Sequence, residues 1–375
     1  MSIRQQNQGS IVKPGFNPLG AQTSTILYNI YSWGANASGQ LGLGNITNYS
    51  SPKQVGSLYW TASACGQVFT TAIKSDGTLW AWGDNTNGQL GISNRTNYSS
   101  PKQIGSLTTW SKVSASGYFM GAIKTDGTMW SWGQNNVGQL GLNNTTYYSS
   151  PKQVGALTNW SLVARGRYFC AATKTDGTLW TWGQNNNGQL GQGNITYYSS
   201  PKQVGALTTW SNVSAGESFC VGIKTDGTFW SWGDNSSGQL GSGTRTTRSS
   251  PVQVGSLTNW ARASAGTSET IVVKTDGTFW SWGNGGDGQL GLGNQTSYSS
   301  PKQVGSLTNW SLVGQSMEST TTAIKTDGTL WVWGKSINGK LGLGNTTRYS
   351  SPKQVGSLTT WLNVGCGDEH TIAIG

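Results

Sequence analysis

The sequence contains little histidine, cysteine or charge. Its 375 residues include one histidine and four cysteines, and 10% of them are charged. Nucleophilic catalysis needs a base within hydrogen-bond reach of a serine or cysteine, so a single histidine argues against a hydrolase. The cysteines lack C-x-x-C spacing, so we predict buried free thiols rather than a metal site or a redox motif; they are Cys65, Cys170, Cys220 and Cys366.

Long apolar segments are also missing. No run approaches the roughly 20 residues of a membrane helix, so we expect no membrane span. The first 25 residues lack the apolar core of a signal peptide, which predicts synthesis in a cytoplasm. The chain is nevertheless rich in aromatic residues, at 11%, and this abundance excludes a disordered protein.

Tryptophan recurs with a period of about 50 residues. The dipeptide Trp-Gly occurs seven times, with its tryptophan at positions 33, 82, 132, 182, 232, 282 and 333. A second series has seven members, at 60, 110, 160, 210, 260, 310 and 361, and a third has six, at 80, 130, 180, 230, 280 and 331. This regularity is typical of an array in which each unit packs against the next.

Each unit reads as four short strands. Residues 110–113 and 119–124 alternate or carry β-branched side chains, and residues 125–128 supply a glycine turn. A helical period is absent, so helices should be scarce. The sequence therefore predicts an all-β fold, a seven-bladed β-propeller over residues 26–375.

The two ends of the chain each hold part of one unit. Six Asp-Gly-Thr turns accompany the seven Trp-Gly dipeptides. The chain stops within a unit at residues 370–374, and residues 27–33 supply the missing part. We therefore predict that strands from both termini complete one blade, which closes the ring and removes exposed strand edges.

The motifs W-x-x-V-x-x-G, D-G-T-[LMF]-W-x-W-G, G-Q-L-G-x-G and S-S-P-x-Q-V closely resemble the regulator of chromosome condensation repeat family, in a bacterial or phage-like variant. The resemblance covers about residues 26–375 and implies the same propeller. The founding member of that family is a nuclear exchange factor for a small GTPase that also binds nucleosomes. Its exchange activity depends on an inserted wedge, and the units here differ in length by only one residue. The resemblance therefore implies the fold, and the fold alone does not carry the exchange activity.

The residue types that often act in catalysis are interpreted here as structural. His370 occupies a position that holds phenylalanine in four other units, so we expect a strand residue. Six of the ten aspartates lie one per unit in the Asp-Gly-Thr turns, where Asp before Gly favours a tight turn. We predict that the protein is no enzyme and has no catalytic residues, no cofactor and no metal.

The basic residues are distributed in rings. The net charge is +10, and 12 of the 24 basic residues are lysines that recur before the Asp-Gly-Thr turns or after Ser-Ser-Pro. One lysine per unit in each series gives a dilute charge, so nucleic acid is not the expected partner. Arg165 and Arg167 beside Tyr168 form a local basic and aromatic cluster that is too small to decide the matter.

Recognition is expected in the loops that follow Trp-Gly, because they vary while the rest of the unit does not. The predicted contact residues of these loops are Asn85, Asn135, Asn185 and Asn235. Tyrosines before Ser-Ser-Pro add amphipathic contacts suited to a protein or a surface glycan; they are Tyr98, Tyr148 and Tyr198. Packing of these tyrosines on the blade edge is an equal alternative.

Residues 1–25 lie outside the repeat and contain glycine and proline breakers, so we predict an extended N-terminal arm. Its apolar residues would anchor it to a protein partner; they are Ile11, Val12, Phe16 and Leu19.

Two functional interpretations follow. The first is a non-enzymatic propeller anchored by its arm in a larger assembly such as a virus particle, as a decoration, fibre or tail-associated protein on a virion or microbial surface. Low charge and near-identical blades rich in Asn, Ser, Thr and Gly favour it. The alternative is an intracellular regulator in the cytoplasm that binds a small GTPase or chromatin.

Overall fold

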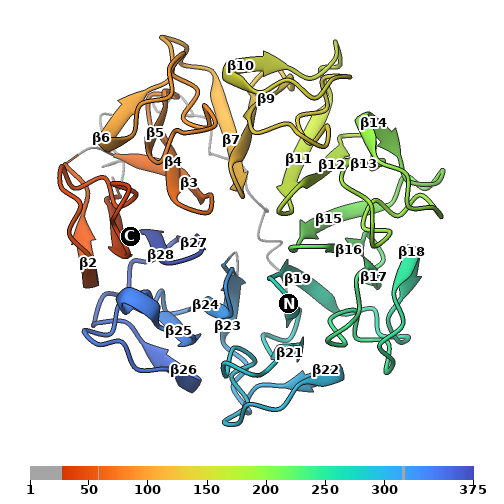
Figure 1. Ribbon diagram of the computed structural model, residues 1–375. Helices are drawn as coiled ribbons and strands as arrows, with labels where there is room; N and C mark the ends of the chain where they lie inside the picture. The colour runs from red at the N-terminus through yellow and green to blue at the C-terminus, as the bar shows by residue number, and fades with distance from the viewer. Residues whose placement is uncertain (1–27, 58, 315–316) are drawn as a thin grey trace, which may run out of the picture.

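Seven four-stranded antiparallel sheets surround a central channel (Figure 1). The structure is a computed structural model that describes residues 28–57, 59–314 and 317–375. It confirms the prediction of an all-β, seven-bladed propeller. Within these residues the helical structure is one short 3-10 turn, η1 (Ile337–Gly339), which lies in a loop. The arm of residues 1–25 lies outside the described residues, as do its predicted anchors Ile11, Val12, Phe16 and Leu19.

In six blades the strands run in sequence order from the channel outward. Blade 1 contains both chain ends, with its two inner strands from the C-terminal end and its two outer strands from the N-terminal end. In order from blade 1, the first strands are β27 (Asn363–Cys366), β3 (Trp60–Cys65), β7 (Trp110–Ser116), β11 (Trp160–Arg165), β15 (Trp210–Ala215), β19 (Trp260–Ala265) and β23 (Trp310–Val313). The second strands are β28 (His370–Ile374), β4 (Phe69–Lys74), β8 (Phe119–Lys124), β12 (Phe169–Lys174), β16 (Phe219–Lys224), β20 (Glu269–Lys274) and β24 (Thr320–Lys325). The third strands are β1 (Ile30–Gly34), β5 (Leu79–Gly83), β9 (Met129–Gly133), β13 (Leu179–Gly183), β17 (Phe229–Gly233), β21 (Phe279–Gly283) and β25 (Leu330–Gly334). The outer strands are β2 (Tyr49–Gln54), β6 (Tyr98–Gln103), β10 (Tyr148–Gln153), β14 (Tyr198–Gln203), β18 (Arg248–Gln253), β22 (Tyr298–Gln303) and β26 (Tyr349–Gln354).

Blade 1 joins the two ends of the chain. Its strand order is β2-β1-β28-β27, and the pairing of β1 with β28 extends from Ile30 opposite Ile374 to Gly34 opposite His370. In Figure 1 the red N-terminal strands lie beside the dark blue C-terminal ones. The predicted closure of the ring by both termini is confirmed, and it gives β1 and β28 the hydrogen-bonding partners that an open array would lack.

The Asp-Gly-Thr motif forms the turn between the second and third strands. The carboxylate of Asp126 accepts hydrogen bonds from the Thr128 backbone N–H at 2.9 Å and from its hydroxyl at 2.7 Å. The Trp130 indole N–H donates to the same hydroxyl at 2.9 Å. Gly127 has a φ of +78°, a conformation that favours glycine. The motif is therefore a hairpin device that also orients a tryptophan.

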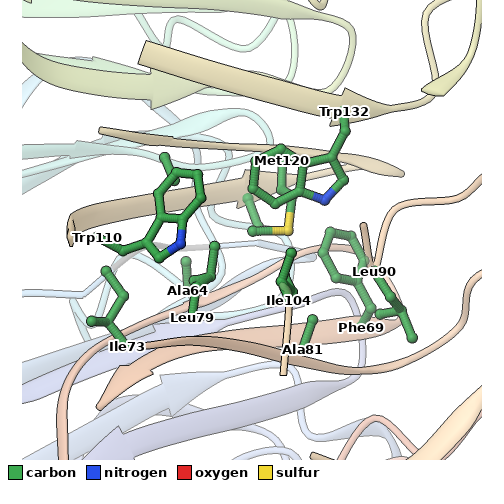
Figure 2. Close-up of a cluster of buried hydrophobic side chains, with 12 residues drawn as sticks. Ala64, Phe69, Ile73, Leu79, Ala81, Leu90, Ile104, Trp110, Met120 and Trp132 are labelled. Atoms are coloured by element: carbon green, nitrogen blue, oxygen red, sulfur yellow. The ribbon is translucent and has the colours of Figure 1, made fainter. Parts of the chain in front are cut away.

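Adjacent blades are joined through the tryptophan of Trp-Gly. Trp132 is fully buried between blades 2 and 3, where it lies near Met120, Phe69 and Leu90 (Figure 2). Its indole N–H donates to the backbone oxygen of Gln89 in the preceding blade at 3.1 Å. All seven such tryptophans make the equivalent bond, at 2.8 to 3.1 Å. A Cβ at Gly91, where φ is +72°, would collide with the same indole, which explains the second glycine of Gly-Gln-Leu-Gly.

The interface between blades 3 and 4 contains a buried cation. Arg165, at the end of β11, is 2% exposed, and its guanidinium stacks on the Phe119 ring at 4.7 Å. None of its three side-chain nitrogens has a hydrogen-bond partner among the described residues, and burial lowers its pKa. The guanidinium fits because β8 has a glycine, Gly121, where a Cβ would overlap it. The corresponding pair between blades 5 and 6 is Ala265 and Val221.

We expect Trp132→Phe to lower the free energy of unfolding by about 2 kcal/mol or more, because it leaves the buried Gln89 carbonyl unpaired and opens a void. The control is Trp130→Phe, because Trp130 is a partly buried tryptophan whose indole N–H donates only within its own blade. It should cost less than about 1 kcal/mol. Urea unfolding measures both, and an equal loss in the two variants would contradict the role assigned to the bond between blades.

Replacing the buried cation should stabilise the ring. The double variant Arg165→Ala with Gly121→Val reproduces the Ala265 and Val221 pair of another interface, so its packing already occurs in this chain. Removing an unpaired buried charge should raise the free energy of unfolding by about 1 to 3 kcal/mol. The measurement is a urea melt beside the wild type. A less stable double variant would show that the guanidinium has a favourable partner.

Candidate functional site

The propeller has two distinct faces. We call the end that carries the turns between first and second strands, together with the long loops after Trp-Gly, the loop face. The opposite end carries the Asp-Gly-Thr turns and the connections from blade to blade, and we call it the junction face. Because the blades are near-identical in sequence, a specific site should lie where they differ.

Turns from all seven blades meet at the end of the channel on the loop face. Each contributes a different residue to one small hollow; in blade order these are Asp368, Gln67, Gly117, Arg167, Glu217, Thr267 and Glu318. The space left between them is about 30 Å³, enough for about one water molecule. A macromolecular partner would therefore lie on this ring of turns rather than enter the channel.

The ring of turns is where the repeat loses its symmetry. All four glutamates of the chain lie in these turns or at the start of the strand that follows; they are Glu217, Glu269, Glu318 and Glu369. Arg167 forms an ion pair with Glu217 of the next blade. The glutamates of the chain are thus concentrated around one opening.

A pocket of about 340 Å³ lies beside this ring, between blades 7, 1 and 2. Its charged lining residues are Glu318, Lys335, Lys340, Asp368 and Glu369. Lys335 lies 3.4 Å from Glu318, and the side-chain amide of Asn338 donates to Glu369 at 3.0 Å. We call it the blade-7 pocket.

Lys340, which lines this pocket, stands where the other six blades have a glutamine. In blade 3, for example, Gln139 accepts a hydrogen bond from the Val137 backbone N–H at 3.0 Å. A lysine cannot accept a hydrogen bond, and its loop contains the turn η1 instead. The buried ammonium donates to the backbone oxygens of Met317 at 2.6 Å and Asp368 at 2.7 Å. It thereby connects blade 7 to the turn of blade 1.

Burial sets the protonation of the neighbouring groups. Burial, followed by the nearby Glu318 carboxylate, raises the pKa of Asp368 to about 6. Burial and the Lys340 charge lower the pKa of His370 to about 3, so its imidazole is neutral. The Thr70 hydroxyl donates to the Gln40 backbone oxygen at 2.8 Å, so it must accept from His370 Nε2, 3.0 Å away. His370 is therefore a buried hydrogen-bonding residue of β28.

The four predicted asparagine contacts are fully buried. The Asn85 amide donates to the Asn94 backbone oxygen at 3.1 Å, and its carbonyl accepts from the Leu90 N–H at 2.9 Å. Asn135, Asn185 and Asn235 make the equivalent bonds. The hydrogen bonds of these asparagine side chains fix the conformation of the loop. A partner at these loops would therefore contact the exposed residues beside the asparagines.

The tyrosines remain accessible in part. Tyr98, Tyr148 and Tyr198 are half-buried on the outer strands. Each hydroxyl accepts from an asparagine amide at 3.2 to 3.3 Å, and a lysine ammonium lies 5.0 to 5.6 Å from each ring centre. Packing on the blade edge is thus observed, and a role in partner contact stays a prediction.

Sequence reasoning missed the ring of turns and the blade-7 pocket. The signal was available, because an alignment of the seven copies shows that the turn before the second strand also varies, and that every glutamate lies in this turn or at the first residue of that strand. Within residues 28–57, 59–314 and 317–375, no cluster of three or more potential metal ligands was found. The same residues include no helix with the length and apolar character needed to cross a bilayer.

Asp368→Asn should change how stability depends on pH. A carboxyl whose pKa is higher folded than unfolded stabilises the fold when protonated, and this contribution is lost as the pH rises from about 4 to 6. The variant should therefore be more stable than the wild type at pH 7 by about 1 to 2 kcal/mol, with no advantage at pH 4.

The control for this experiment is Asp126→Asn. Hydrogen bonds from Thr128 lower the pKa of Asp126, so that variant should lose stability at neutral pH. Thermal melts at pH 4 and pH 7 measure both. Equal stability of Asp368→Asn and the wild type at pH 7 would contradict the assignment.

Solved structures share this fold over most of the chain. The crystal structure of human WBSCR16 matches with a TM-score of 0.83 at 22% identity, covering 93% of this chain and 98% of that one. Prp20p from Saccharomyces cerevisiae, whose crystal structure is described together with its binding properties to Gsp1p and histones, matches with a TM-score of 0.83 at 20% identity, covering 94% of this chain and 92% of that one. At these identities the likeness shows the fold alone.

Curated relatives match over short stretches. Human protein RCC2 is 33% identical over 66 residues, which is 17% of this chain and 13% of that protein. The X-linked retinitis pigmentosa GTPase regulator homolog of Caenorhabditis elegans is 40% identical over 57 residues, which is 15% of this chain and 4% of that protein. The family model described as the RCC1-like domain matches residues 29–373. The chain therefore belongs to the RCC1-like domain family.

Proposed function

We propose that the protein is a non-enzymatic binding propeller that docks a protein partner on the loop face, over the ring of turns and the blade-7 pocket. The observation that supports this most directly is the concentration of blade-to-blade differences there, since all four glutamates lie in or beside these turns. A partner with one specific surface requires an asymmetric site. The remainder of the ring, which repeats from blade to blade, serves as a rigid scaffold.

The chemistry of the blade-7 pocket favours a basic group from the partner. Glu318, Asp368 and Glu369 line it, whereas the Lys340 ammonium is bonded to two backbone oxygens. Lys335 neutralises only Glu318. An arginine or lysine side chain would find carboxylate acceptors in a partly desolvated hollow, where such pairs contribute to specificity.

Family membership favours the regulatory interpretation over a virus-particle role. Prp20p, which shares the fold, is described with binding properties to Gsp1p and histones, and two curated relatives are RCC2 and a GTPase regulator homolog. We therefore propose a small GTPase or a chromatin protein as the partner. The virion location, the bacterial or phage origin and the role of the N-terminal arm stay predictions without a test.

The test measures binding of Gsp1p and of core histones to the full chain by biolayer interferometry. The double variant Glu318→Gln with Glu369→Gln should weaken the binding of the true partner roughly tenfold, because both carboxylates lose their charge. Asp234→Asn, on the outer loop of blade 5, is the matched control and should leave the affinity unchanged.

Binding that is equal in the double variant and the wild type would overturn the assignment of the pocket. The absence of binding to both proteins would overturn the proposed partner classes. Melting curves of each variant confirm that the fold is intact.

A further inference from the structure

The seven copies also differ at the opposite end of the channel, at the junction face. The second residue after the tryptophan that leads into each first strand is of five different types; in blade order these residues are Asn363, Ala62, Lys112, Leu162, Asn212, Arg262 and Leu312. The tryptophan itself does not vary, and it follows a blade-to-blade connection; the Trp210 backbone N–H, for example, donates to the Gly177 backbone oxygen of an Asp-Gly-Thr turn at 3.1 Å. Since the first strands border the channel, the channel wall is irregular at this level (Figure 1).

A hollow of about 770 Å³ opens at this level between blades 5, 6 and 7, and we call it the junction hollow. Three consecutive first strands line it, with Asn212 from β15, Arg262 from β19 and Leu312 from β23. Ala263 and Val313 extend the apolar part of its wall. Sites for small organic ligands have volumes of about 300 to 1,000 Å³. The junction hollow therefore has the size of a ligand site, whereas the hollow at the loop-face end of the channel holds about one water molecule.

Arg262 is the charged group of the junction hollow that lacks a partner. Its side chain is exposed, and its guanidinium forms no ion pair or hydrogen bond within residues 28–57, 59–314 and 317–375. The cation at the equivalent position of blade 3 differs, because the Lys112 ammonium donates to the Ser161 backbone oxygen of blade 4. An unpaired guanidinium can hold a carboxylate or a phosphate by two parallel hydrogen bonds. Arg262 is thus available to an anion, whereas Lys112 is not.

The other charged groups of the lining are already engaged. Lys224 is 7% exposed, and its ammonium lies 3.4 Å from the ring centre of Trp230. Asp226 supplies the carboxylate of the lining, and this carboxylate accepts hydrogen bonds from the Thr228 backbone N–H at 2.9 Å and from its hydroxyl at 2.7 Å. Within their described bounds the seven first strands contain no aspartate or glutamate. The charge of the junction hollow that remains unengaged is therefore positive.

We propose that the junction hollow binds a small organic anion. The Arg262 guanidinium holds the carboxylate or phosphate of the ligand, and Leu312 and Val313 pack against its apolar part. The Asn212 amide can donate a further hydrogen bond to a ligand oxygen. A charged group beside an apolar wall is the combination that fixes both the position and the orientation of such a ligand.

Other anions fit the junction hollow less well. An inorganic ion would leave the apolar wall and most of the volume without a role. A nucleic acid needs cations at several phosphates, and the positions equivalent to Arg262 in the two neighbouring blades hold Asn212 and Leu312. The junction hollow and the blade-7 pocket lie at opposite ends of the propeller, so this proposal does not depend on the partner proposed for the loop face.

The experiment is isothermal titration calorimetry of the full chain with four probes. The compounds 1-naphthyl phosphate and 1-naphthoate are the organic anions, and they distinguish a phosphate from a carboxylate ligand. Their controls are 1-naphthol, which lacks the charge, and inorganic phosphate, which lacks the apolar part. At least one of the two organic anions should bind about tenfold or more tightly than either control, because the organic anions alone use both parts of the hollow.

Variants of the full chain then locate the site. Arg262→Ala should weaken binding of the organic anion by about tenfold or more, and Arg262→Lys should fall between the two because it keeps the charge without the fork of donors. Leu312→Asn, which introduces the side chain that blade 5 has at this position, should weaken binding by about fivefold. The matched control is Lys112→Ala, which removes the cation from the equivalent position of blade 3 outside the hollow and should bind as the wild type does.

Weaker binding in the Arg262 and Leu312 variants, with normal binding by Lys112→Ala and unchanged melting curves, supports the site. Unchanged binding in Arg262→Ala, an equal loss in Lys112→Ala, or binding of 1-naphthol as tight as that of the organic anions would overturn it. Failure of the wild type to bind either organic anion would also overturn it.

Discussion

The hydrogen bond from each Trp-Gly tryptophan to the backbone of the preceding blade is the contact on which the ring depends. It fixes the indole between two sheets, and the glycine after Gln-Leu exists because that indole lies against it. The acceptor is a backbone oxygen, so the side chain at the acceptor residue is not constrained by the bond. The Trp33 indole N–H donates to the backbone oxygen of Lys340 at 2.8 Å, just as its counterparts donate to the backbone oxygens of glutamines.

Because the side chain of the acceptor residue is free to vary, the contacts between blades can stay constant while the residues of the candidate site change. Lys340 could replace glutamine without loss of the bond between blades, and its ammonium then became available to the turns of Met317 and Asp368. The second-strand positions show the same division, because His370 and Glu269 stand where other blades have phenylalanine. Regular contacts between blades thus tolerate irregular residues around the channel, and the irregular residues provide the specificity of the loop face.

The fold could be predicted from the sequence because the period of the tryptophans and the stagger of the termini are one-dimensional signals. The site could not be read in the same way. Asn85 follows Trp-Gly in a variable loop, yet it is buried because its amide and carbonyl satisfy the backbone of that loop. The blade-7 pocket joins Lys340 to Asp368 across two blades, and that proximity arises only when the ring closes. The turn variation was visible in the sequence, whereas the meeting of all seven turns was not.

The shared blade imposes an order on synthesis. The β1–β2 hairpin leaves the ribosome before all other described strands, and because Ile30 pairs with Ile374, β1 meets its second partner only after β28 has emerged. Until then the growing chain has a strand with an unpaired edge at each end of an incomplete ring. The hydrogen bond from the Trp33 indole to the Lys340 backbone oxygen of blade 7 also cannot hold the closed ring together. Closure joins segments separated by almost the whole chain, a slow step by the logic of loop entropy. The nascent propeller therefore has open sheet edges until β28 has been synthesised, and its demand for chaperone protection lasts at least until then.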